Sequence, residues 1–140
     1  MQRKRTLSDM QVIVDSIISY NGQTDRLHME TTGKLYEKNG TWYLFYKEPE
    51  DSSLAGVTTT IKATGNCVSI LRSEPYASRI IVEPGKTFFT TYPTAGGIFD
   101  LEVRGQRVAV LMRENGGQIR LQYGLLEQTV SMTIQVKESV

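Results

Sequence analysis

The chain has 140 residues and a mass of 15.8 kDa, which fits one domain. Hydrophobic residues make up 39% and charged residues 22%, so the composition is that of a globular chain and excludes a disordered one. The formal net charge of +1 argues against nucleic acid as a partner, because such binders rely on a strong positive field.

The N-terminus carries the only run of charge, Arg3-Lys4-Arg5. We expect residues 1–9 to form a flexible basic tail and residues 10–140 to form a single domain. The opening residues lack the apolar stretch of a signal peptide, and no apolar run approaches the roughly 20 residues of a membrane helix. Together with a single cysteine, this predicts a cytoplasmic protein without membrane contact.

Short turn sequences divide the chain into segments rich in β-branched and aromatic residues, which is typical of β-strands. None of the segments has the apolar period of a long helix. The turns are predicted at Asn21-Gly22, Asn39-Gly40, Pro49 to Ser53, Gly65-Asn66, Pro84-Gly85, Gly96-Gly97, Gly105 and Asn115-Gly116.

Several segments alternate apolar and polar residues, so each strand has one dry and one wet face. The dry faces run through Val57, Thr59, Ile61 and Ala63, then Ile119, Leu121 and Tyr123, and finally Val130, Met132, Ile134 and Val136. The segment from Thr41 to Tyr46 holds four aromatic residues, and we expect a core strand there. If exposed, such rings could instead stack on nucleic-acid bases.

About ten strands joined by short turns suit an antiparallel barrel or a sandwich. Because nearly every connection is of hairpin size, the pattern favours an all-β meander barrel, whereas a Greek-key sandwich needs longer crossings. A closed meander also removes the exposed edges of a sheet.

Few residues suggest catalysis or metal binding. His28 is the only histidine and Cys67 the only cysteine, so the usual nitrogen and sulfur zinc sites are excluded. No Gly-x-Ser-x-Gly elbow is present, and we expect no cofactor, no metal and no catalytic residue. We expect His28 to be solvent-facing or hydrogen-bonded. Asp100 and Glu102 share one strand face and are interpreted as solvated.

Two charged residues continue dry strand faces. Arg72 follows Val68 and Ile70, and Glu48 follows Leu44 and Tyr46. A charge on a dry face must be paired, reach water at the end of the barrel, or meet a ligand. Their opposite signs suggest a mutual ion pair.

The same segments resemble the YwiB-like family of uncharacterised bacterial proteins, over about residues 10 to 137. The matching pieces are Gly33 to Gly40, Leu44 to Glu48, Gly56 to Lys62, Val68 to Arg72, the group Tyr92, Thr94 and Gly97, and Ile119 to Leu125. The resemblance implies a calycin-like (lipocalin-like) barrel and a cytoplasmic setting, with no established activity. It places Glu48, Lys62, Arg72, Tyr92 and Thr94 on polar motif positions, which are the candidate ligand-binding residues. Glu74 stands where the family pattern has glycine.

Two functions from different classes compete. In the first, the barrel binds a small polar or anionic amphiphilic ligand, with Arg72 selecting its acidic head group. In the second, the barrel is filled with side chains and serves as a non-enzymatic protein-interaction or structural module. An enzyme that uses carboxylates, tyrosine and arginine is a weaker third hypothesis, because no activating group is evident.

Overall fold

The computed structural model describes residues 8–75, 77–94 and 96–139, and its regular elements are ten β-strands in one antiparallel sheet, which confirms the all-β meander. Within these residues no helix is long and apolar enough to cross a membrane. The strands are β1 Ser8–Tyr20, β2 Gln23–Lys38, β3 Thr41–Lys47, β4 Thr58–Ala63, β5 Val68–Arg72, β6 Ser78–Val82, β7 Thr87–Thr94, β8 Gly97–Arg113, β9 Gly116–Leu125 and β10 Gln128–Glu138.

The first and last strands of the chain are neighbours in the middle of the sheet, because β1 pairs with β10. The strand order runs β6-β5-β4-β3-β2-β1-β10-β9-β8-β7, so the barrel is nearly closed and its ladder ends at β6 and β7. The turn between these two strands is fixed to β8 instead. Gly85 donates a backbone hydrogen bond of 3.1 Å to the Gly105 carbonyl, and the Gly105 N–H donates one of 2.8 Å to the Lys86 carbonyl.

The start of the sheet differs from the expected domain boundary. Ser8 and Asp9 already belong to β1 and pair with Leu35 and Lys34 of β2. The rest of the predicted basic tail, residues 1–7, lies outside the described residues.

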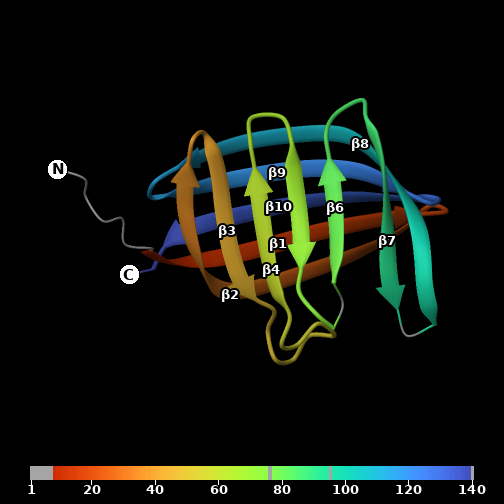
Figure 1. Ribbon diagram of the computed structural model, residues 1–140, viewed down its shortest axis with the longest axis horizontal. Helices are drawn as coiled ribbons and strands as arrows, with labels where there is room; N and C mark the ends of the chain where they lie inside the picture. Colours follow the sequence, from red (N-terminus) through yellow and green to blue (C-terminus); the bar gives the residue numbers. More distant parts are fainter. Residues whose placement is uncertain (1–7, 76, 95, 140) are drawn as a thin grey trace.

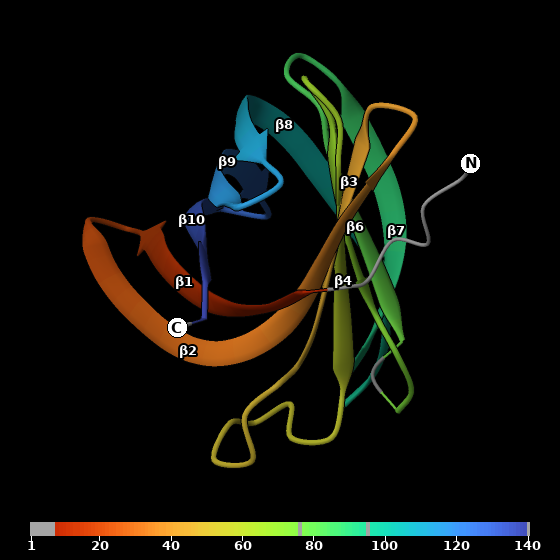
Figure 2. The same cartoon turned by 90° about the vertical axis from the view of Figure 1, so that its left-hand side faces the viewer.

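The barrel consists of two crossed layers, as Figures 1 and 2 show: β3 to β7 run across the direction of β1, β2, β8, β9 and β10. Such crossing requires strands that turn a corner from one layer to the other. β2 does so near Gly33, where a Cβ atom would clash with the Phe45 carbonyl oxygen. A residue without a side chain is therefore needed at this corner.

The second corner lies in β8. One predicted turn was wrong here. Gly105 was expected to end a strand, but it lies inside β8 beside a register shift between Gly105 and Arg107. A Cβ atom there would clash with the backbone of Glu83, because the β6–β7 turn packs directly on this glycine. A β-bulge bends the strand while the ladder continues on both sides.

The core is formed by inward side chains of both layers. The predicted dry faces of β9 and β10 point inward, and Ile119, Leu121, Ile134 and Val136 are buried, with Met132 packed against them. Removing this apolar surface from water is the main stabilising contribution to the barrel. The buried cluster draws residues from β1 to β6 and from β8 to β10, including Met10, Val12, Leu35, Leu44, Ile61, Val68, Ile70, Ile80, Val82, Val103 and Val130.

Candidate functional site

A row of polar side chains lies at one end of the barrel, on the inner face of three neighbouring strands. Tyr46 of β3 is opposite Thr59 of β4, and Thr59 is opposite Arg72 of β5. They continue the inward faces of Leu44, Ile61 and Ile70, because side chains two residues apart point to the same face of a strand. The same alternation that directs apolar side chains into the core therefore places this polar row at one end of the core.

Glu48 joins the row from just beyond β3 and is buried, with 8% of its surface exposed. Its backbone N–H donates a 2.9 Å hydrogen bond to the Val57 carbonyl across the start of the β3–β4 connection. Its Oε2 atom accepts a 2.5 Å hydrogen bond from the Thr59 hydroxyl. A buried carboxylate needs such a donor to offset the loss of water.

Tyr46 is buried beside these groups. Burial raises the pKa of its phenol far above the ordinary range, and the negative charge of Glu48 acts in the same direction. The positive charge of Arg72 and a hydrogen bond with Thr59 oppose that rise in the pKa without cancelling it. The Tyr46 phenol is therefore neutral at physiological pH and can act as a hydrogen-bond donor.

Arg72 contributes the least satisfied group of the row. Its Nε atom is buried and has no hydrogen-bond partner among the described residues. The ion pairs formed by the described residues do not include one between Arg72 and Glu48, so the predicted direct pair was wrong. Both residues continue inward strand faces, and both charges act on the pKa of the Tyr46 phenol, which Glu48 raises and Arg72 lowers.

The remaining candidates lie in different places. Lys62 is exposed on the outer face, with its Nζ atom 5.9 Å from the ring centroid of Tyr43, so it does not join the inner row. Tyr92 and Thr94 are at the end of β7, and Figure 1 shows this end on the same side of the barrel as the β3–β4 and β5–β6 connections. Their side chains lie outside the described part of the structure. Glu74 is exposed beyond Arg72.

The groups most often used in catalysis are elsewhere. His28 is exposed on β2, where Nδ1 lies 2.5 Å from Asp15 Oδ1 and Nε2 lies 3.0 Å from Glu30 Oε2, which confirms its hydrogen-bonded, solvent-facing role. Cys67 is half-buried, and burial together with Glu83 raises the pKa of its thiol, which disfavours the reactive thiolate. Among the described residues, no cluster of His, Cys, Asp and Glu could hold a metal ion.

The aromatic residues of β3 lie on both of its faces. The prediction treated Thr41 to Tyr46 as a core strand, and Leu44 and Tyr46 are indeed buried, with Trp42 packed against the core. Tyr43 and Phe45 alternate with them and point outward, where both stack on Tyr36 of β2. The dry face predicted to run through Leu44 and Tyr46 is the buried one.

These features define a class: a nearly closed, ten-stranded antiparallel barrel with a buried polar row at one end. A family described as a domain of unknown function, DUF1934, matches residues 12–136, and the chain belongs to this family. The crystal structure of the ywiB protein from Bacillus subtilis is similar, with a TM-score of 0.87 and 23% sequence identity over 96% of this chain and 94% of that one.

The likeness to the ywiB protein shows a shared fold and confirms the family resemblance found in the sequence. No curated protein matches the chain. A shared fold alone does not determine the function of the barrel.

Proposed function

We propose that the barrel binds a small anionic ligand at the end where the β3–β4 and β5–β6 connections lie, with Arg72 as the anchoring donor. The observation that carries this proposal is the buried Nε–H of Arg72, which has no acceptor among the described residues. Leaving a buried donor unsatisfied costs about 1–3 kcal/mol, and more for a charged group. A carboxylate or phosphate oxygen of a ligand would supply the missing acceptor.

The other residues of the row suit a ligand that has a second polar group beside its acid. The Thr59 hydroxyl holds Glu48 through Oε2, and the neutral Tyr46 phenol lies beside them. A ligand that carries a hydroxyl or amino group next to its acid could donate to Glu48 while it accepts from Arg72. Tyr92 and Thr94 remain candidates for further contacts, because β7 ends at the same end of the barrel.

The core limits the size of such a ligand. Beyond the polar row, from Leu44, Ile61 and Ile70 onward, the inward side chains form one buried apolar cluster that offers no polar partner for an acid. We therefore place the ligand at the end of the barrel and not in a central lumen. This location favours a small molecule with a short apolar part over a long amphiphile.

The test compares dansylglycine, which carries a carboxylate, with its neutral amide, dansylglycinamide. The acid is expected to bind with one-to-one stoichiometry and an increase in dansyl fluorescence. Arg72→Met should weaken the acid by about 1.5–3 kcal/mol, the contribution of a hydrogen bond to a charged group, and leave the amide unchanged. Arg79→Met is the matched control, because Arg79 is exposed on the neighbouring strand β6. Equal losses for acid and amide would contradict the proposal.

A protein-interaction module is the second candidate, and two exposed apolar residues favour it. Phe89 of β7 is 76% exposed and Ile98 of β8 is 75% exposed. Exposed apolar surface often marks a contact with another protein. If neither dansyl probe binds, and Phe89→Ser with Ile98→Ser abolishes co-sedimentation with a cellular partner, this second function replaces the first.

A further inference from the structure

Three aromatic rings form a continuous stack on the outer face of the barrel, on the side of the sheet opposite the polar row. The centroid of the Tyr36 ring lies 4.8 Å from that of Tyr43, at an interplanar angle of 10°, and 5.5 Å from that of Phe45, at 25°. Tyr36 is thus the middle ring. Lys62 lies beyond Tyr43, with its Nζ atom 5.9 Å from that ring.

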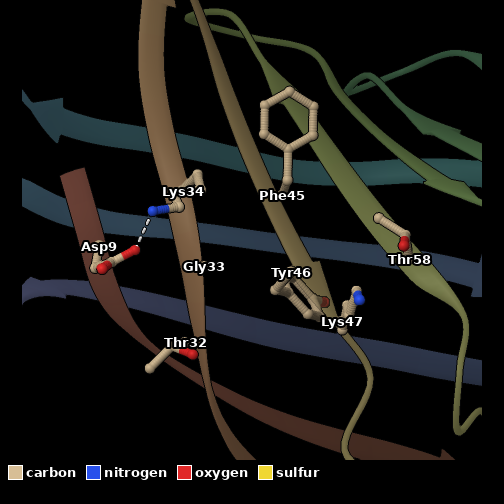
Figure 3. Close-up of a pocket in the computed structure, with 8 residues that line it drawn as sticks. All are labelled: Asp9, Thr32, Gly33, Lys34, Phe45, Tyr46, Lys47 and Thr58. Carbon is tan, nitrogen blue, oxygen red and sulfur yellow. Dashed lines mark hydrogen bonds and ion pairs between the residues drawn. The ribbon is translucent and has the colours of Figure 1, made fainter. Parts of the chain in front are cut away.

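The other end of the stack, at Phe45, borders a pocket of about 290 Å³. Its lining includes Lys34, Lys47 and Thr58, and Figure 3 shows Phe45 and the two lysines around it. Gly33, at the corner of β2, also lines this pocket. A pocket of this volume has room for a flat group beside Phe45, the last ring of the stack.

The part of this face formed by β3 to β6 carries positive charge although the whole chain is nearly neutral. The sequences of β3, β4, β5 and β6 contain no Asp or Glu. Lys47 and Lys62 are exposed at outward positions of β3 and β4, and neither belongs to an ion pair among the described residues. Lys34 is paired with Asp9, the one acidic residue that lines the pocket.

We propose that this outer face binds single-stranded nucleic acid, with one base stacked on Phe45 in the pocket and phosphates held by Lys47 and Lys62. Aromatic rings stack on any base, and lysines neutralise the backbone. Lys62 is opposite Tyr43, four residues before Lys47 along β3, so the two lysines are about 13 Å apart along the strand direction. That spacing exceeds one nucleotide and favours a strand over a free mononucleotide.

The aromatic stack and the lysines contribute to binding in different ways. The stack supplies affinity for any base, so weak sequence preference is expected. The lysines supply a contribution that falls as salt rises, because binding releases condensed counterions. The site is independent of the inner polar row, since it uses the opposite face of the same strands.

The test measures the fluorescence anisotropy of a labelled eight-nucleotide RNA of mixed sequence at low salt. Wild-type protein should bind it saturably, and Phe45→Leu should weaken binding about tenfold, as expected for the loss of one stacked base. Lys47→Gln and Lys62→Gln should each lower the slope of log K against log salt by about 0.7. Phe89→Leu and Lys137→Gln change an exposed aromatic and an exposed lysine outside this face and should have no effect.

Circular dichroism of each variant first establishes that the barrel is folded. Failure of the RNA to bind, or equal affinity of wild type and Phe45→Leu, would overturn the proposal. Displacement of the RNA by polyglutamate at equal charge concentration would do so too, because it would show a site for any polyanion. Displacement of the RNA by an equal concentration of AMP would also overturn the proposal, because it would show that the site binds a free nucleotide and not a strand.

Discussion

The Thr59 hydroxyl donates a 2.5 Å hydrogen bond to Glu48 Oε2 inside the barrel, where Thr59 is 0% and Glu48 8% exposed. This bond joins β4 to the residue that follows β3, and so ties down the start of the β3–β4 connection. Because Thr59 lies between Tyr46 and Arg72 in the register, the same bond fixes the centre of the polar row. The geometry of the candidate site thus depends on one threonine.

Thr59→Val should destabilise the protein, because valine has nearly the same shape but leaves the buried carboxylate without its donor. We expect a loss of about 1–3 kcal/mol in the free energy of unfolding. Urea denaturation followed by the fluorescence of Trp42, the only tryptophan, measures it. Thr60→Val, on the outer face of the same strand, should change stability by less than about 0.5 kcal/mol. A loss no larger than this control would show that Glu48 does not need the bond.

Glu48 should couple more strongly to Thr59 than to Arg72. Double-mutant cycles combine Glu48→Gln with Thr59→Val in one case and with Arg72→Met in the other. Residues in direct contact show interaction energies of about 0.5–3 kcal/mol, whereas Arg72 forms no direct ion pair with Glu48. A larger coupling energy for the Arg72 cycle than for the Thr59 cycle would contradict this expectation and support the direct Glu48–Arg72 ion pair that the sequence suggested.

Gly33→Ala should disturb the corner of β2. The added Cβ would meet the Phe45 carbonyl oxygen and approach Val12 Cγ2 to 3.1 Å, so the two layers must shift. Overpacking of this kind costs about 1–3 kcal/mol. Thermal unfolding is the measurement, and Gly65→Ala is the control, because a Cβ at Gly65 has nothing within 4 Å. Equal melting temperatures for the two variants would show that the corner tolerates a side chain.

The strands were predictable because alternation and turn residues are local signals. The face of Val130 to Val136 and the turns at Asn21-Gly22 and Asn39-Gly40 follow from neighbouring residues alone. The corners were not predictable, since a single glycine such as Gly105 looks the same in a turn and in a bulged strand. Local alternation also says nothing about where a meander closes, so the ends of the ladder at β6 and β7 emerged only from the structure.

The candidate site was predictable only in part. Alternation predicted that Glu48 and Arg72 continue the dry faces of their strands, and the structure shows that these faces point into the barrel. Whether the two side chains form an ion pair depends on the distance between the ends of two different strands, which no local sequence pattern predicts. Thr59 was missed as a functional residue because a threonine on a dry face looks like an ordinary β-branched core residue.

His28 should titrate above its ordinary value of 6.5, because the hydrogen bonds that its ring donates to the carboxylates of Glu30 and then Asp15 raise the pKa of the imidazole. Its stabilising contribution is therefore complete below the unfolded pKa and is lost as the pH rises through the folded pKa. Proton NMR of this only histidine measures the midpoint, which Glu30→Gln should lower. His28→Gln should cost more stability at about pH 5.5 than at about pH 8.5. A midpoint at or below 6.5 would contradict the ion pairs seen around the ring.

The most direct test of the binding account observes the Arg72 Nε–H group itself. In a ¹H–¹⁵N spectrum of arginine side chains, its signal is identified as the one that Arg72→Lys removes. We predict that titration with dansylglycine shifts this signal saturably at one-to-one stoichiometry, because the ligand supplies the acceptor that the Nε–H lacks among the described residues. Dansylglycinamide should leave it in place. If dansylglycine binds and the Arg72 signal does not move, Arg72 is not the anchor and the proposed site is wrong.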